Sequence, residues 1–156
     1  MRYLVSEILE QLTELKVESD RVALLKKYSD NALLKEVLKL NFDPEVKFDL
    51  PAGQPPYKVN PQPAGLTDTN LYAESRRMYL LIKGHPRRPA GVKRPQIEGI
   101  FIQMLEGIHK GEAELLIALK DKALAKKYTG LSEKTVRAAF PDILPEKQAT
   151  VPKEAA

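Results

Sequence analysis

Basic side chains gather in one stretch of the sequence, and their types and spacing could do chemistry there. Between Ser75 and Ile97 no acidic residue occurs. The basic residues of this segment are Arg76, Arg77, Lys83, Arg87, Arg88, Lys93 and Arg94. Without these 7, the 25 lysines and arginines of the chain fall to 18, against 21 aspartates and glutamates. The positive excess of the protein therefore lies in this basic segment, and such a local excess attracts anionic partners.

The basic segment predicts contact with phosphates or with an acidic protein surface. Arginine and lysine neutralise phosphates without reading bases, which gives salt-sensitive binding that tolerates many nucleic-acid sequences. Lys93 and Arg94 also precede an expected helix start, where free backbone N–H groups favour anions. Tyr79 is the only aromatic residue of the segment, so stacking of single-stranded bases is not predicted. A solvated loop is the alternative without a partner.

A proline-rich stretch over residues 51–63 supplies a second candidate surface. Repeated prolines remove backbone donors and favour polyproline II or turns. The simpler interpretation is a linker between two helical parts of the chain. The functional interpretation is an extended arm that lies on a partner protein. The predicted partner-binding residues of this arm are Pro55, Pro56, Tyr57 and Lys58.

The stretch over residues 123–144 is similar to a helix-turn-helix. Gly130 suits the left-handed turn and Ser132 suits the cap of the second helix. Four residues separate Ala125 from Gly130 where the motif has three, which rotates the first helix by about 100° relative to the turn. Pro141 also ends the second helix early. These departures favour a structural helical corner over a DNA-reading element.

Residues that would support catalysis, a metal ion or a cofactor are sparse. The chain has no cysteine, so disulfides and thiolate zinc sites are excluded. Neither His85 nor His109 has a metal-ligand partner at helical spacing, and His109 is expected to cap a helix end. No glycine-rich phosphate loop or nucleophile elbow occurs. We therefore predict a protein that is not an enzyme and has no catalytic residues, no metal site and no cofactor.

Helical periodicity accounts for most of the chain that positions these residues. Ser19 and Asn31 are expected to cap helices in the N-terminal third. A later helix is expected to run from Thr67 or Asp68 to Gly84, which would place Arg76 and Lys83 two turns apart on one helix. The expected helices cover residues 4–15, 19–28, 31–41, 67–84, 95–108, 112–123 and 133–140.

These patterns predict a mainly α fold with little β structure, in which two small helical bundle halves are joined by a proline-rich extended segment. A short strand is expected over residues 46–50. The predicted divisions of the chain are 1–42 as an N-terminal helical bundle, 43–66 as the arm or linker, 67–144 as a C-terminal helical region with the basic loop, and 145–156 as a tail.

The sequence resembles a family of small uncharacterised proteins encoded by large contractile-tailed bacteriophages, including phages of cyanobacteria and vibrios. The resemblance rests on "LLKKYSDNALLKEVLKLNFDPEVKFDLPAGQPPYK", "IFIQMLEGIHKGEAELLIALKDK" and "GLSEKTVRAAFPDILP". Its most specific part is "FDPEVKFDLPAGQPPYK". It implies a phage context and supplies no activity or site residue.

Three functions are compatible with these observations. The leading hypothesis is a non-enzymatic phage accessory protein that binds nucleic acid, or a nucleic-acid-bound replication or transcription complex, through the basic segment. A virion or assembly component whose arm and tail contact neighbouring subunits is the second, and an inhibitor of a host or defence protein is the third. The cytoplasm of the infected cell, or the virion, is the expected location. No apolar run approaches bilayer length, so no membrane partner is expected.

Overall fold

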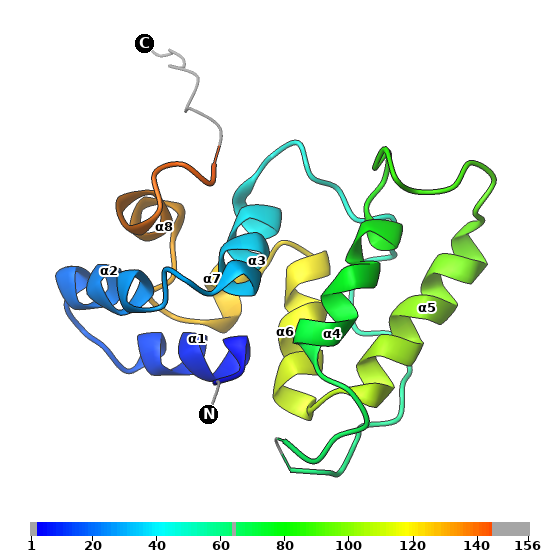
Figure 1. Ribbon diagram of the computed structural model, residues 1–156, viewed down its shortest axis with the longest axis horizontal. Helices are drawn as coiled ribbons and strands as arrows, with labels where there is room; N and C mark the ends of the chain where they lie inside the picture. The colour runs from blue at the N-terminus through cyan, green and yellow to red at the C-terminus, as the bar shows by residue number, and fades with distance from the viewer. Residues whose placement is uncertain (1–2, 64, 145–156) are drawn as a thin grey trace.

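The protein is mainly α-helical, as the sequence predicts (Figure 1). The computed structural model describes residues 3–63 and 65–144; the predicted tail, 145–156, lies outside them. The helices are α1 (Val5–Thr13), α2 (Glu18–Lys27), α3 (Ala32–Phe42), α4 (Leu71–Glu74), the 3₁₀ helix η1 (Ser75–Leu81), α5 (Arg94–Gly107), α6 (Lys110–Lys120), α7 (Leu124–Lys127) and α8 (Glu133–Ala139). No helix of the described part is long and apolar enough to cross a membrane.

Local sequence signals explain where several helices begin. The side chain of Asn31 accepts a hydrogen bond from the backbone N–H of Leu34 at 3.0 Å, as expected of an N-cap. The expected cap at Ser19 is wrong, because α2 begins at Glu18 with Val17 at its N-cap position. Acidic residues in the first turn of α2 and lysines in its last turn suit the helix dipole instead.

Helix α6 lies at the centre of the packing. It contacts α1 and α3 from the N-terminal part of the chain and α5 and α7 from the C-terminal part. Helices α2 and α8, far apart in sequence, also pack against each other (Figure 1). Apolar residues of all these helices form one hydrophobic core. The domain boundaries given above stay a prediction.

The segment between α3 and α4 is extended and lies on the helices. The expected strand over 46–50 is reduced to one antiparallel bridge between Phe48 and Ile82. Its flanking hydrogen bonds run from Asp49 N to Leu81 O and from Lys83 N to Lys47 O, each at 2.8 Å. This bridge ties the start of the arm to the end of η1.

The helix expected from Thr67 or Asp68 to Gly84 is shorter and partly of a different type. Asn70 is the N-cap, with its side chain accepting from Ala73 N at 3.0 Å, and only one α turn follows before the chain tightens into η1. The Ser75 hydroxyl donates to Tyr72 O at 2.9 Å, the carbonyl that an α-helix would pair with residue 76. This competition favours the tighter 3₁₀ winding.

Candidate functional site

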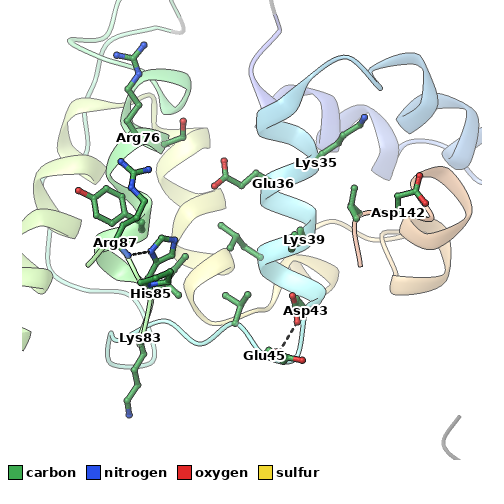
Figure 2. A pocket seen from close by; sticks show the side chains of 18 residues that line it. Lys35, Glu36, Lys39, Asp43, Glu45, Arg76, Lys83, His85, Arg87 and Asp142 are labelled. Atoms are coloured by element: carbon green, nitrogen blue, oxygen red, sulfur yellow. Dashed lines mark hydrogen bonds between the residues drawn. The ribbon is translucent and has the colours of Figure 1, made fainter. Parts of the chain in front are cut away.

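An open cleft of about 1010 Å³ lies between α3 and η1 with the loop after it (Figure 2). We call it the α3–η1 cleft. The side chains on its η1 wall that matter below are Arg76, Tyr79, Ile82, Lys83, His85 and Arg87. Those on and after α3 are Lys35, Glu36, Lys39, Asp43 and Glu45, and Asp142 lies at the rim. The cleft therefore joins the N-terminal helices to part of the predicted basic segment.

The 3₁₀ winding of η1 decides which side chains reach the cleft. In a 3₁₀ helix residues three apart are eclipsed, so Arg76, Tyr79 and Ile82 form one row, which lines the cleft. Met78 and Leu81 form the neighbouring row and are fully buried in the core. One face of η1 is thus fixed by the core, and the adjacent row is left to face the cleft.

Three flat side chains gather on the η1 wall. The Arg87 guanidinium lies 4.8 Å from the centroid of the Tyr79 ring, within the range of a cation–π contact. The ring centroids of Tyr79 and His85 are 5.6 Å apart, with an interplanar angle of 47°. His85 Nδ1 accepts a hydrogen bond from Arg87 N at 3.1 Å, which fixes the loop so that both side chains stand beside Tyr79.

The α3 wall carries charges of both signs. Lys35 and Lys39 lie one turn apart, and Glu36 points from α3 toward the η1 wall (Figure 2). Burial raises the pKa of Glu36, and the nearby His85 partly offsets that rise. Asp43 accepts from Glu45 N at 2.9 Å, so part of the acidic charge at the lower end is engaged with backbone.

Several cations of the basic segment are already paired within the protein. Arg88 lies 2.7 Å from the Asp49 carboxylate and also donates to Ile82 O at 3.2 Å. Arg94 lies 3.9 Å from Asp49, and Arg77 contacts Glu74 at 2.5 Å. The hydrogen bond from Arg88 lowers the pKa of Asp49, and the charges of Arg88, Arg94 and Lys83 act in the same direction. These pairs neutralise three of the predicted contact residues.

The remaining cations of the segment fall into two places. Within residues 3–63 and 65–144, Arg76, Lys83, Arg87 and Lys93 form no ion pair. Arg76 and Arg87 stand on the η1 wall, whereas Lys83 points away from them at the other end of the cleft (Figure 2). Lys93 is exposed at the N-cap position of α5. The structure therefore brings Arg76 and Arg87 together and disperses the rest.

Comparison with known proteins identifies the family. A model of the Family of unknown function (DUF6433) matches residues 8–126. The chain belongs to this family. The matched part of this DUF6433 protein includes both walls of the α3–η1 cleft and the proline-rich arm, and it ends before α8. No curated protein matches the sequence.

The proline-rich arm of the DUF6433 chain lies against its own α5 and α6. Gly53 N donates to Asp121 Oδ2 at 3.2 Å, and Lys58 N donates to Glu106 Oε2 at 2.8 Å. Pro55 and Tyr57 are half-buried, while Pro56 and the side chain of Lys58 face outward. Burial raises the pKa of Tyr57, and the charge of Glu114 adds to the effect. Contact of these four residues with a partner stays a prediction.

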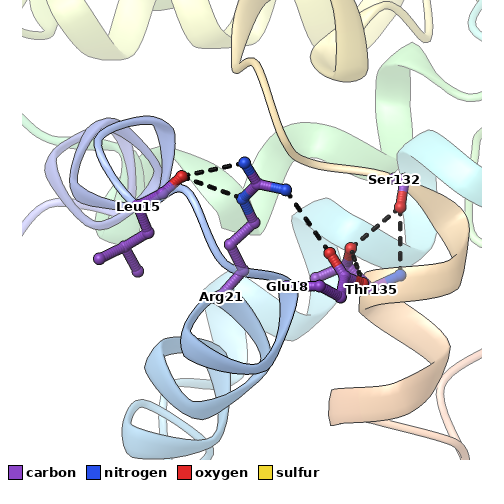
Figure 3. Close-up of polar contacts among 5 residues, drawn as sticks. All are labelled: Leu15, Glu18, Arg21, Ser132 and Thr135. Atoms are coloured by element: carbon purple, nitrogen blue, oxygen red, sulfur yellow. Dashed lines mark hydrogen bonds and ion pairs between the residues drawn. The ribbon is translucent and has the colours of Figure 1, made fainter.

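The helix-turn-helix-like stretch forms a packed corner in this family member. Gly130 has a φ of 95°, and Ser132 Oγ accepts from Thr135 N at 3.2 Å, as the sequence predicts. Thr135 in turn donates to Glu18 Oε2 at 2.7 Å, so the corner is joined to α2 (Figure 3). The first helix, α7, has only four residues. Packing explains the residues of the motif.

The histidines and acidic residues do not assemble a metal centre in the described part of the chain, where no group of three possible ligand residues lies close enough together. His109 caps α6, since its Nδ1 accepts from Gly111 N at 3.1 Å. Glu112 in the same turn is fully buried. Its carboxylate oxygens accept from Leu71 N at 3.2 and 3.3 Å, so it joins the start of α6 to the start of α4.

Proposed function

We propose that this chain is a non-enzymatic binding protein that holds nucleic acid, or a nucleic-acid-bound complex, at the α3–η1 cleft. The observation that carries the proposal is the position of Arg76 and Arg87. Both stand on one wall of the cleft, and neither forms an ion pair within the described residues. The resemblance to phage proteins places this activity in an infected cell.

The charge distribution narrows the contact surface relative to the whole basic segment. Arg88 is only 12% exposed and is held by Asp49, so its loss would damage packing as well as charge. Arg76 and Arg87 are exposed and can rearrange to meet phosphate oxygens, which arginine binds through two parallel hydrogen bonds. Phosphate contacts of this kind bind many nucleic-acid sequences and weaken with salt.

The test is fluorescence anisotropy with labelled oligonucleotides over a salt series. The double variant Arg76→Glu/Arg87→Glu should lose about tenfold or more in affinity, and its salt slope should fall by about 1.4 on single strands. The matched control is Lys26→Glu/Lys134→Glu, which makes the same charge change at exposed residues outside the cleft. The absence of wild-type binding at low salt, or an equal loss in the control, would refute the proposal.

A second candidate function is supported by exposed apolar residues near the arm. Val59 is 48% exposed and Leu66 is 68% exposed. Apolar side chains in an extended segment suit contact with a neighbouring protein subunit, as in a virion or assembly component. Mass spectrometry of purified particles, combined with cross-linking at residue 59, tests this function; absence of the chain from particles would remove it.

A further inference from the structure

We propose that the nucleic acid held in the α3–η1 cleft is single-stranded, with an unpaired base stacked on the Arg87–Tyr79 pair and a neighbouring phosphate at Arg76. This inference rests on the proposed function and specifies its ligand. It reverses the expectation drawn from the sequence, in which Tyr79 was the only aromatic residue among the cations. His85 and Arg87 join Tyr79 only when the loop after η1 folds back beside it.

The stacked side chains supply a platform for a base. The Arg87 guanidinium lies over one face of Tyr79 at 4.8 Å, and His85 leans against the same ring at 5.6 Å. Aromatic rings and guanidinium planes are the groups on which proteins stack unpaired bases. The hydrogen bond from Arg87 N to His85 Nδ1 at 3.1 Å holds the platform in place before any ligand binds.

A phosphate-binding group stands beside this platform. Arg76 lies one 3₁₀ turn before Tyr79 in the same row, which separates the two positions by roughly 6 Å along the helix axis. Arg76 is exposed at the mouth of the cleft. A nucleotide whose base stacks at Arg87 and Tyr79 therefore has a guanidinium beside it for a backbone phosphate.

The opposite wall disfavours a duplex. Glu36 points across the cleft from α3, and Asp43, Glu45 and Asp142 also line the cleft. Carboxylates accept hydrogen bonds from base amino groups but repel phosphates, so a second strand against this wall would be unfavourable. The volume of about 1010 Å³ matches the upper end of small-molecule sites, about 300–1,000 Å³, and suits a short stretch of one strand.

Fluorescence anisotropy tests this inference separately from the proposed function. The probes are a labelled oligothymidine, an abasic single strand of the same length and a duplex of that length, with polyglutamate as competitor. The variant Tyr79→Leu removes the ring, and Tyr79→Phe keeps it as the matched control. Far-UV circular dichroism establishes that both variants fold.

We expect oligothymidine to bind more tightly than either the duplex or the abasic strand. Tyr79→Leu should weaken oligothymidine binding about tenfold, leave abasic-strand binding unchanged, and Tyr79→Phe should behave as the wild type. Duplex binding equal to single-strand binding, or an equal effect of Tyr79→Leu on both single strands, would overturn the inference while leaving the proposed function intact. Equal competition by polyglutamate, or no binding to any oligonucleotide, would overturn both.

Discussion

Tyr128 carries a polar atom that the fold leaves without a hydrogen bond. The residue is 2% exposed, and its hydroxyl finds no hydrogen-bond partner in the part of the chain that the structure describes. Burial raises the pKa of this hydroxyl, and the charges of Glu10 and Glu114 act in the same direction. The ring contributes to the core, whereas the buried hydroxyl costs free energy.

Replacing Tyr128 by phenylalanine should therefore stabilise the protein. We expect Tyr128→Phe to raise the free energy of unfolding by about 1 kcal/mol, because it removes a buried group without a partner. Tyr72→Phe is the control of opposite sign, since the Tyr72 hydroxyl accepts from Asn31 Nδ2 at 2.8 Å and donates to Tyr3 O at 2.6 Å. Urea denaturation measures both; a loss of stability in Tyr128→Phe would contradict this account.

Glu112 makes folding stability depend on pH. Its pKa is raised from 4.5 to about 7, chiefly by burial, with the Leu71 N–H hydrogen bond opposing the rise and Glu7 adding to it. Below about 4.5 the carboxyl is protonated in both the folded and the unfolded chain. As the pH rises toward 7 the unfolded chain loses this proton first, so the free energy of unfolding falls, and it levels off above the folded pKa.

The variant Glu112→Gln isolates this contribution. Glutamine keeps an oxygen that can accept from Leu71 N but has no proton to lose in this range. From pH 4 to pH 8 the wild type should lose about 3 kcal/mol of unfolding free energy relative to Glu112→Gln. Urea titrations at the two pH values measure the difference. A gap between the two proteins that does not change with pH would show that Glu112 is not protonated in the fold.

At this scale, sequence reasoning succeeded where a residue acts on its near neighbours. Asn31, Ser132 and Gly130 were predicted because a cap or a left-handed turn depends on a few adjacent residues. The pairing of Arg88 with Asp49 was not predicted, because 39 residues separate the two. An absence of acid along a segment therefore did not mean an absence of acid around it.

Among the elements, the packing of α2 against α8 depends on the turn before α8. Arg21 donates from Nε and Nη2 to Leu15 O at 3.1 and 3.0 Å (Figure 3). A Cβ atom at Gly130 would lie 2.7 Å from Arg21 Nε, and the φ of 95° at Gly130 is unfavourable for other residues. The turn needs glycine for both reasons.

Gly130→Ala should destabilise the corner. We expect a loss of about 1–2 kcal/mol in the free energy of unfolding from the left-handed backbone and the displaced guanidinium. In the background Arg21→Ala the clash disappears and only the backbone cost remains, so the loss should be smaller. Chemical denaturation of the four proteins completes the cycle; equal losses in both backgrounds would exclude the steric contribution of Arg21.

Element type was harder to predict than element position. The periodicity of α1, α5 and α6 comes from wide apolar faces that the core buries, so their places follow from the sequence. The 3₁₀ winding of η1 does not, because the Ser75–Tyr72 hydrogen bond and the Phe48–Ile82 bridge act through folded geometry. The change of period moved Arg76 and Tyr79 into one row.

Across the whole molecule, α6 connects the two ends of the sequence through one core. It is contacted by α1 and α3 on one side and by α5 and α7 on the other. We therefore expect a single unfolding transition, with coincident midpoints by far-UV circular dichroism and tyrosine fluorescence. Two separated transitions would show that the N-terminal and C-terminal helices fold independently, and that the cleft between them is not part of one cooperative unit.

The cleft itself was outside the reach of sequence reasoning. Its walls come from α3 and from η1 with its loop, which meet only after the intervening arm has laid itself on α5. The cations of one wall were predicted as candidates, but Glu36 and Lys39 of the other wall lie in a helix whose exposed residues carried no distinguishing pattern. Composition can point to one wall of such a site and cannot show that it is a cleft.

The hydrogen bonds of the arm have a consequence for cutting the chain. Gly53 is held by Asp121, and Lys58 and Asn60 by Glu106, so residues 1–62 are fastened to the C-terminal helices upstream of any break at Gln62. Two separately encoded pieces, 1–62 and 63–156, should then find each other and rebuild the protein. Co-expression with a tag on one piece would recover both, which would make the break a natural place for inserting a reporter.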